Sequence, residues 1–575
     1  MKLNKLLFFV LIPLLIMSCS GGGTSAPAVT LSSITITPAS PSIAPGATEQ
    51  FTATGTYSNG TKQDLTTSVA WSSSDTTDAP IGNTGLVTTS SSAGTIKITI
   101  TASSGSISGS ATLAVIASFE ITPTNSNIPL GATQQFTATA TFSDSSTQDI
   151  TTSVVWSSSI PTVAAFSNIA GYNGLATSFA TGQTSITASL TGGAVSPSSP
   201  VLTVDSSNIN NVLYVTVNGG VAPGGYPNEP CVSVTICSPG TSNCQTIDNI
   251  LLDTGASGLR IFKSLLTVSL TQVASGSGSL TECIQYSDNS ADWGPVQLAD
   301  IILGNEPAVR VPIQIIDSTF SGYNSCSLNG QYILDTSPSI TGYNGILGVG
   351  LFTEDCGSEC TSVANNGMYY SCNGSSCTGT EVSLNNQVQN PVSLLLLDNN
   401  GVIVQLPSIP LGGLLSVNGI LILGIGTRSN NIPSGVTMYP ADPNSANLTY
   451  GDFTTVFNGK TYSDSFIDSG SNGLFFDQGS ISALTTCDSD WFCASPTLSL
   501  SATTKGYTGS PSGTVSFQIG DADTLLYQTS NNVFIELGGP DTSFDWGLPF
   551  FLGRSVYVGI DGQTSSLGTG PYWAY

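Results

Sequence analysis

Histidine is absent from this chain of 575 residues, and basic residues are scarce. Without histidine the chain cannot form a Ser-His-Asp or Cys-His catalytic group or a histidine-ligated metal site, and we expect no metal. An enzyme of this composition has to use carboxylates, hydroxyls, thiols or a bound cofactor, and no cofactor is expected. The 11 Lys and Arg residues stand against 36 Asp and Glu, a net charge of −25. This charge argues against nucleic acid as a partner, because phosphates are bound by basic patches.

Long apolar runs are missing as well, with one exception near the first residue. Residues 6–17 form an apolar run behind two lysines, which is too short to span a bilayer comfortably and fits a signal-peptide core. The run leads into Cys19, and Ser and Gly follow it, in a pattern that resembles a bacterial lipoprotein signal. The resemblance implies a signal peptide over residues 1–18, lipidation of Cys19 and a flexible tether over residues 19–30. A plain secretory signal with an incidental cysteine is the alternative.

The rest of the composition is typical of exported β-structure. Charged residues make up 8% of the chain and hydrophobic residues 39%, with 62 Gly and 30 Pro. Frequent turn residues between short alternating segments favour a loop-rich, all-β protein over a disordered one. The length predicts three or four domains. We expect the protein in the bacterial cell envelope, at the outer membrane or cell surface, with the N-terminal lipid as its only membrane contact.

An internal repeat fills much of the first third of the chain. Residues 36–74 align with residues 121–159 at a constant offset of 85, with 24 identities in 39 positions. The alternation of apolar and polar residues in each copy predicts a β-sandwich, with Trp71 and Trp156 in the cores. The Thr-Pro opening, the Gly-Ala-Thr-x-Gln-Phe strand and the Val-x-Trp-Ser-Ser segment resemble bacterial immunoglobulin-like domains of group 2.

This resemblance implies two immunoglobulin-like β-sandwiches, over residues 31–116 and 117–205. Such domains usually act as stalks or adhesive units on a cell surface. We find no chemical constellation in them, so a spacer is the favoured role, and specific ligand binding is the alternative.

Two similar segments stand out in the rest of the chain. Residues 250–259 and 465–474 each contain an apolar strand, then Asp-Thr-Gly or Asp-Ser-Gly, then small residues and Gly-Leu. Downstream of the first, Asn-Gly-Ile-Leu-Gly ends at Gly348, and downstream of the second, Phe-Phe-Leu-Gly ends at Gly553. One such Asp motif is weak evidence, whereas the same order of parts occurring twice indicates an internal duplication.

This arrangement resembles the pepsin-like, two-lobed aspartic proteases. The resemblance implies a bilobal β domain, with an N-lobe over residues 206–390 and a C-lobe over residues 391–575. It makes Asp253 and Asp468 the catalytic pair. It also implies supporting roles for turn hydroxyls, closely packed glycines, strand glycines and a flap tyrosine, namely Thr254, Ser469, Ser471, Gly255, Gly470, Gly348, Gly553 and Tyr286.

Two carboxylates can hydrolyse a peptide bond without histidine or metal. When they lie a hydrogen bond apart they share one proton, so the ionised member activates a water and the protonated member donates to the scissile carbonyl. The chain departs from the family at Ala256, where serine is usual, and at the flap segment, which reads Tyr286-Ser-Asp-Asn instead of Tyr-Gly-Thr-Gly. A basic prosegment is also missing. The alternative is that both Asp residues only cap turns in a β-rich fold.

Eleven cysteines besides Cys19 suggest a disulfide framework in an exported chain. Connectivity cannot be deduced from sequence, but close spacing favours four pairs, with a looser fifth pair that leaves Cys231 over. The four pairs are Cys237–Cys244, Cys356–Cys360, Cys372–Cys377 and Cys487–Cys493, and the fifth is Cys283–Cys326.

The sequence therefore predicts a monomeric surface lipoprotein in which an Ig-like stalk displays an aspartic endopeptidase. Its substrate would be a peptide or protein, and its pH optimum would be acidic. The alternative is a non-catalytic surface protein, whose pepsin-like cleft binds a peptide or glycan while the Ig-like domains adhere.

Overall fold

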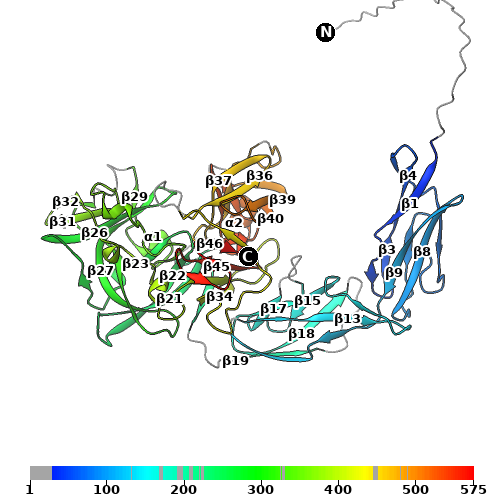
Figure 1. Ribbon diagram of the computed structural model, residues 1–575, viewed down its shortest axis with the longest axis horizontal. Coiled ribbons are helices and arrows are strands. Elements are labelled where there is room, and N and C mark those ends of the chain that lie inside the picture. Colours follow the sequence, from blue (N-terminus) through cyan, green and yellow to red (C-terminus); the bar gives the residue numbers. More distant parts are fainter. Residues whose placement is uncertain are drawn as a thin grey trace, which may run out of the picture. The chain divides into compact units, whose positions relative to one another are not determined.

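The computed structural model describes residues 29–130, 132–166, 173–190, 199–205, 211–218, 220–221, 226–323, 326, 331–443, 451–479, 481–487 and 490–575. The predicted signal peptide, Cys19 and nearly all of the predicted tether lie outside these residues. Among the described residues the α-helices are two short ones, α1 (Pro338–Thr341) and α2 (Ala522–Gln528), and strands dominate (Figure 1). None of the helices in these ranges is long and apolar enough to cross a bilayer.

The first compact unit extends to Ala117 and includes Phe142–Ser145. It is a β-sandwich with sheet orders β1-β4-β5 and β2-β9-β8-β6 and a short β3-β7 pair. In β8, buried Ile98 and Ile100 alternate with exposed Thr99, the period that a strand with one buried face requires. The strands are β1 (Leu31–Thr37), β2 (Ser42–Ile43), β3 (Thr48–Gln50), β4 (Thr52–Tyr57), β5 (Lys62–Asp64), β6 (Ala70–Ser73), β7 (Leu86–Thr88), β8 (Ile96–Ser104) and β9 (Ile107–Val115).

The second compact unit begins with another β-sandwich, with sheet orders β10-β13-β14, β11-β19-β18-β15 and β12-β17-β16. Trp156 is fully buried in its core and stacks on Phe166, with 5.4 Å between ring centroids. Trp71, the matching residue of the first sandwich, is only partly buried, so the expectation of a core tryptophan holds fully for one copy alone. The strands are β10 (Glu120–Thr122), β11 (Asn125–Pro129), β12 (Thr133–Gln135), β13 (Thr137–Thr141), β14 (Thr147–Asp149), β15 (Val154–Ser158), β16 (Ala164–Phe166), β17 (Leu175–Ser178), β18 (Gly182–Leu190) and β19 (Val201–Asp205).

The rest of the second unit is a two-lobed β domain. Its first lobe is built mainly from the strands up to β32, and its opening strand β20 pairs with β34 of the later chain, from Val212↔Ile422 to Val217↔Val417. These strands are β20 (Val212–Val217), β21 (Pro230–Cys237), β22 (Cys244–Asp253), β23 (Ser257–Phe262), β24 (Thr271–Gln272), β25 (Ala274–Ser275), β26 (Gly278–Gln285), β27 (Ser290–Ile302), β28 (Val309–Ile316), β29 (Ile333–Leu334), β30 (Gly345–Val349), β31 (Tyr369–Asn373) and β32 (Ser376–Gly379).

The second lobe contains a seven-stranded sheet of order β40-β39-β36-β37-β42-β38-β41, while β33, β34, β35, β43 and β46 continue the sheet of the first lobe. The strands are β33 (Gly401–Gln405), β34 (Val417–Leu423), β35 (Met438–Pro440), β36 (Phe453–Phe457), β37 (Lys460–Ile467), β38 (Leu474–Phe476), β39 (Cys493–Lys505), β40 (Ser512–Asp521), β41 (Gly538–Pro540), β42 (Phe544–Trp546), β43 (Ser555–Gly559), β44 (Thr564–Ser565), β45 (Gly568–Thr569) and β46 (Tyr572–Ala574). The fold class, all-β with two sandwiches followed by a bilobal β domain, is confirmed.

The same strand arrangement occurs once in each lobe. In the first lobe β22 runs parallel to β30, with Asp253 opposite Gly348, and β30 runs antiparallel to β23. In the second lobe β37 runs parallel to β42, with Ile467 opposite Trp546, and β42 runs antiparallel to β38. The counterpart of Gly348 is therefore Gly547, which directly follows β42. The expectation for Gly553 was wrong, because a short 3-10 helix (Leu548–Phe550) precedes it and the strand beside β37 is β42.

Candidate active site

Asp253 and Asp468 lie side by side, although 215 positions separate them in the sequence. Asp253 is the last residue of β22, and Asp468 directly follows β37. The backbone N–H of Gly255 lies 2.7 Å from Oδ1 of Asp253 and 3.2 Å from Oδ1 of Asp468, so one donor reaches both carboxylates. The preceding residues Leu252 and Ile467 are fully buried and anchor both turns in one apolar core.

Hydroxyl groups beside the two Asp residues tie the turns together. Thr254 Oγ1 donates to the main-chain oxygen of Ile467 at 2.9 Å, and Ser469 Oγ donates to that of Leu252 at 2.6 Å. Each hydroxyl also accepts from the backbone N–H of the other residue. Both side chains are buried. The structure thus gives the hydroxyls of Thr254 and Ser469 a supporting role, as the resemblance implied, by cross-linking the two turns.

The two turns approach each other so closely that only glycine fits at their centres. A Cβ atom on Gly255 would lie 2.6 Å from Cγ of Asp468, and one on Gly470 would lie 2.9 Å from Cγ of Asp253. Behind the turns, a Cβ on Gly348 would lie 2.8 Å from the backbone of Ala256. These glycines are required by close approach rather than by a left-handed backbone.

The surroundings of the two carboxylates differ. Oδ1 of Asp253 accepts from the backbone N–H groups of Gly255 and Ala256. Asp468 instead accepts on Oδ1 from the backbone N–H of Gly470 and on Oδ2 from the hydroxyl of Ser471, at 2.8 Å. Burial, the charge of Asp468 and a hydrogen bond with that residue raise the pKa of Asp253 well above its ordinary value. Ionisation of Asp253 is therefore disfavoured beside the second carboxyl.

Tyr286 lies at the tip of the hairpin formed by β26 and β27, where a flap tyrosine was expected. The turn is closed by the backbone N–H of Tyr286, which donates to the oxygen of Ser290, and Asn289 takes a positive φ of 67°. The hydroxyl of Tyr286 donates to Oδ2 of Asp292 at 2.9 Å, inside its own hairpin. The structure thus forms the hairpin, but it engages this hydroxyl away from the Asp pair.

Tyr226 is a residue of the site that the sequence analysis missed. Its hydroxyl lies 3.3 Å from the main-chain oxygen of Gly470, to which it donates. Burial raises the pKa of Tyr226, and so do the charges of Asp468, of Asp288 on the hairpin tip, and of Asp253. This residue therefore lies near both the carboxylates and the hairpin. It belongs to no recognisable motif, so only the fold could reveal it.

A buried amide holds the segment around Tyr226 against the second lobe. Nδ2 of Asn228 donates to the main-chain oxygens of Asn472 at 2.8 Å and Phe534 at 2.9 Å, and its Oδ1 accepts from the backbone N–H of Phe534. Asn228 is fully buried, so these bonds are shielded from water. Asp545, which follows Phe544 in β42, is a second residue that the sequence analysis missed. Burial and the charge of Asp468 raise the pKa of its carboxyl.

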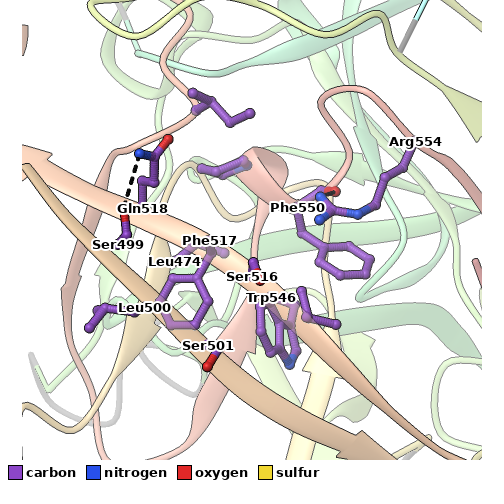
Figure 2. A pocket seen from close by; sticks show the side chains of 13 residues that line it. Leu474, Ser499, Leu500, Ser501, Ser516, Phe517, Gln518, Trp546, Phe550 and Arg554 are labelled. Carbon is purple, nitrogen blue, oxygen red and sulfur yellow. Dashed lines mark hydrogen bonds between the residues drawn. The ribbon is translucent and has the colours of Figure 1, made fainter. Parts of the chain in front are cut away.

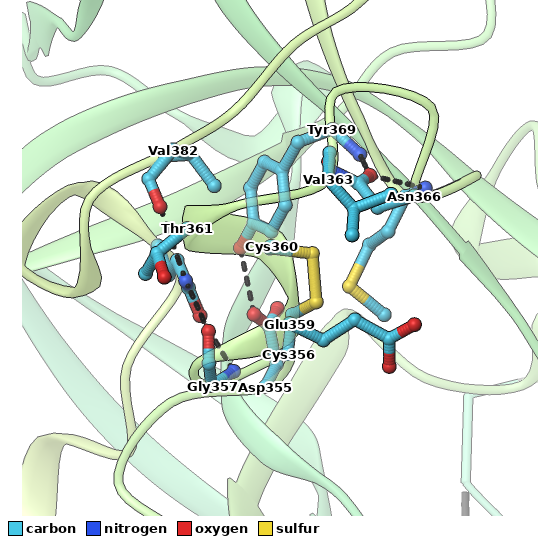
Figure 3. Close-up of a disulfide and its surroundings, with 12 residues drawn as sticks. Asp355, Cys356, Gly357, Glu359, Cys360, Thr361, Val363, Asn366, Tyr369 and Val382 are labelled. Atoms are coloured by element: carbon cyan, nitrogen blue, oxygen red, sulfur yellow. Dashed lines mark hydrogen bonds between the residues drawn. A yellow bond between two sulfur atoms is a disulfide. The ribbon is translucent and has the colours of Figure 1, made fainter. Parts of the chain in front are cut away.

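All four close-spaced disulfides of the sequence prediction are present, and so is the looser Cys283–Cys326 pair. Cys231 is free and buried. Figure 3 shows the Cys356–Cys360 disulfide beside Asp355, whose Oδ1 accepts from the hydroxyl of Tyr369 at 2.7 Å. The disulfides thus lie in the two-lobed domain, as expected for an exported protein.

One group of possible metal ligands occurs in the part of the chain that is described. It comprises Cys487, Cys493, Asp521 and Asp523. The two sulfur atoms form a disulfide and offer no thiolate, and the two carboxylates alone are a poor set of ligands.

A pocket of about 500 Å³ lies in the second lobe, and its lining includes neither Asp253 nor Asp468 (Figure 2). It is largely apolar, and Arg554 stands at its edge with the guanidinium 4.6 Å from the ring centre of Phe550. Trp546 of β42 connects the two regions, since its side chain lines the pocket while its main-chain oxygen accepts from the backbone N–H of Asp468. The Asp pair therefore belongs to the interface of the lobes and not to this pocket.

Comparison with known families assigns both parts of the chain. Residues 30–113 and 115–199 match the bacterial Ig-like domain (group 2), which confirms the predicted Ig-like domains. Residues 207–575 match a family described as protein of unknown function (DUF3443), a description that names no activity.

A relative, ice-binding protein 1 of Shewanella frigidimarina (strain NCIMB 400), is 37% identical over 262 residues. The match covers 42% of this chain and 28% of the relative, so the chain spans little more than a quarter of that protein's length. The family match, in contrast, covers well over half of the chain. The chain therefore belongs to the DUF3443 family of proteins of unknown function, with two bacterial Ig-like domains ahead of the family domain.

Proposed function

We propose that the two-lobed domain is a pepsin-like aspartic endopeptidase that cleaves peptide or protein substrates with Asp253 and Asp468. One observation carries the proposal: the backbone N–H of Gly255 is within hydrogen-bond distance of both carboxylates. Two Asp residues that only capped separate turns would have no reason to share a donor. Two carboxylates this close share a proton and can act as acid and base together.

The surroundings of the two carboxyls differ, and this difference favours one of them as the base and the other as the acid. Asp468, which accepts a hydroxyl hydrogen bond from Ser471, is the charged member and takes a proton from the attacking water. Asp253, with its raised pKa, donates its proton to the oxygen of the scissile carbonyl. The water oxygen bonds to the carbonyl carbon, the C–N bond then breaks, and the leaving nitrogen takes up a proton. The products are a carboxylic acid and an amine.

The proposal includes the setting of the enzyme. A lipid on Cys19 would hold it to the outer membrane or cell surface as a monomer, and the Ig-like domains would act as its stalk. Five disulfides support export, because such bonds persist in oxidising compartments.

Binding without hydrolysis is the second candidate, and the hairpin tip favours it. The hydroxyl of Tyr286 is bonded to Asp292, and the tip has Ser, Asp and Asn where pepsin-like flaps carry glycines. In this case the cleft would hold a peptide or glycan, and the Ig-like domains would contribute to adhesion. The name of the relative, ice-binding protein 1, likewise describes binding.

Hydrolysis can be tested with the purified full chain, its disulfides formed, and a denatured protein mixture as substrate between pH 3 and 8. We expect cleavage with an acidic optimum, abolished by a statine-type inhibitor and by the Asp253→Asn/Asp468→Asn double variant. Asp464→Asn, an exposed site on the same strand as the second turn, is the matched control and should cleave normally. A folded wild-type sample that cleaves nothing at any pH would leave binding as the function.

A further inference from the structure

A third carboxyl, that of Asp545, lies behind the Asp pair in the second lobe. It stands opposite Phe466 in the parallel pairing of β42 with β37, the strand that leads into Asp468. The corresponding position of the first lobe is Ile346, an apolar residue. Asp545 is 6% exposed. A buried carboxyl is costly unless it is neutral or well paired, so its presence in only one lobe calls for a physical reason.

Ser471 connects this carboxyl to Asp468. The Ser471 hydroxyl donates to Oδ2 of Asp468 at 2.8 Å, and the carboxyl of Asp545 lies close to the same hydroxyl. A hydroxyl has one proton and can donate to only one carboxyl at a time. Oδ1 of Asp545 is buried without any hydrogen-bond partner, so an ionised Asp545 would be poorly compensated. A protonated Asp545 can instead donate to the Ser471 oxygen and leave the hydroxyl proton for Asp468.

We propose that Asp545 is a positioning residue, whose protonated carboxyl orients Ser471 toward Asp468 and thereby makes Asp468, rather than Asp253, the charged member of the pair. For its effect on cleavage this inference rests on the proposed function. It explains the asymmetry between the lobes, because the position that matches Ser471 in the first lobe is Ala256 and has no hydroxyl to orient.

The charges around Asp545 favour its acid form. Burial raises its pKa most, and the charges of Asp468 on the adjacent turn, Asp541 on the loop before β42 and Asp253 of the first lobe raise it further, whereas the neighbouring Ser471 hydroxyl lowers it. All three neighbours are acidic, so each opposes a further negative charge at this place. The proton on Asp545 is therefore retained while the Asp pair carries a single charge.

The test measures kcat/KM against pH for the full chain, four single variants and one double variant. In Ser471→Ala and in Asp545→Leu the charged form of Asp468 loses its oriented donor, so the acid limb should move up by about one pH unit. Asp545→Leu should add no further shift in a Ser471→Ala background, because both changes remove the same interaction. Asp545→Asn should restore the acid limb, since its amide N–H also donates to Ser471. Asp541→Asn removes a nearby exposed charge and should not move it.

A second measurement does not depend on cleavage. In ¹³C-carboxyl NMR of the aspartate-labelled chain, with assignments from Asp468→Asn and Asp545→Asn, the titration midpoint of Asp468 should rise in Ser471→Ala and Asp545→Leu. The absence of cleavage together with this rise would overturn the proposed function and retain the inference. Cleavage with an unmoved acid limb and an unmoved Asp468 titration in both variants would overturn the inference and retain the proposed function. Additive shifts in the double variant would also overturn the inference.

Discussion

Thr254 and Ser469 exchange hydrogen bonds across the two lobes, with the backbone N–H of each donating to the hydroxyl of the other, at 3.1 and 2.9 Å. Each hydroxyl in turn donates to a main-chain oxygen of the opposite strand, so four bonds join two turns that carry the candidate catalytic carboxylates. Because all of these groups are buried, the relative position of Asp253 and Asp468 is fixed by bonds that water does not weaken.

Thr254→Ala is expected to destabilise the protein and to reduce cleavage. The change leaves the main-chain oxygen of Ile467 and the N–H of Ser469 without partners in a buried place, and each unsatisfied group costs about 1–3 kcal/mol. Denaturant unfolding and a peptide-cleavage assay would measure both effects. Thr254→Ser keeps the hydroxyl and serves as the control. Equal stability of the two variants would show that the cross-link contributes nothing.

How much of this site the sequence predicts depends on how local each part is. The turns around Asp253 and Asp468 are short motifs whose glycines and hydroxyls act within a few residues, so they could be recognised directly. The strand behind the second turn is selected by pairing across many residues. The segment Phe-Phe-Leu-Gly, ending at Gly553, resembles Ile-Leu-Gly of the first lobe more closely than Asp-Trp-Gly, ending at Gly547, does. The strand is nevertheless formed by the residues that lead to Gly547.

Tyr226 and Asp545 could not be predicted for the same reason. Nothing in their neighbours marks them, and their roles arise because the fold brings them to Gly470 and Ser471. The all-β class and the repeated sandwiches were predictable, because alternation and repetition extend over many residues. Trp71 shows the limit of that reasoning, since an equivalent sequence position is less buried than Trp156.

Asp253→Asn is expected to abolish cleavage and to stabilise the folded protein at neutral pH. The amide removes a buried carboxyl whose charge is repelled by Asp468, and this should raise the free energy of unfolding by about 1–2 kcal/mol at pH 7. The gain should shrink near pH 4, where the wild-type carboxyl is protonated. Urea unfolding at both pH values measures it. Asp464→Asn should show neither effect, and a destabilised Asp253→Asn at pH 7 would contradict the prediction.

The two-lobed domain is expected to be more stable at pH 5 than at pH 8. Burial raises the pKa of Glu229 to about 8 and that of Asp452 to about 7, above the values of an unfolded chain. A raised pKa means that the folded state binds the proton more tightly, so this stability is complete below about pH 4 and is lost as pH rises through 7 and 8. Urea unfolding should show a difference of roughly 2–4 kcal/mol.

Glu229→Gln provides the control for that pH dependence, because its amide does not titrate. The variant should lose part of the difference between pH 5 and pH 8. A wild type that is equally stable at both values, or more stable at pH 8, would rule out the buried protonated carboxyls.

Tyr226→Phe is expected to lower kcat/KM about tenfold with little change in stability. The variant loses only the hydroxyl that donates to the main-chain oxygen of Gly470, a bond worth about 1 kcal/mol, beside the Asp pair. Initial rates and thermal unfolding would separate the two effects. Tyr214→Phe, at an exposed position of β20, is the matched control. An unchanged kcat/KM in Tyr226→Phe would place Tyr226 outside the working site.

Arg260 is a fully buried cation in the first lobe, and its removal should be among the most damaging single changes. Its Nη2 lies 3.0 Å from Oε1 of Glu282 and 2.9 Å from Oδ2 of Asp355, and both carboxyls are almost entirely buried. It thereby supports the strand that carries the hairpin, because Glu282 belongs to β26.

Arg260→Met is expected to lower the free energy of unfolding by about 3–5 kcal/mol, since two buried carboxyls would lose their only close cation among the described residues. The loss should be larger at pH 8 than at pH 5, because at low pH the carboxyls can take up protons. Arg310→Met is the matched control: its ion pair with Asp300 is exposed to solvent and should contribute less than about 1 kcal/mol. Urea unfolding of both variants measures these losses in the free energy of unfolding. Equal losses would mean that burial adds nothing to the strength of the Arg260 ion pairs.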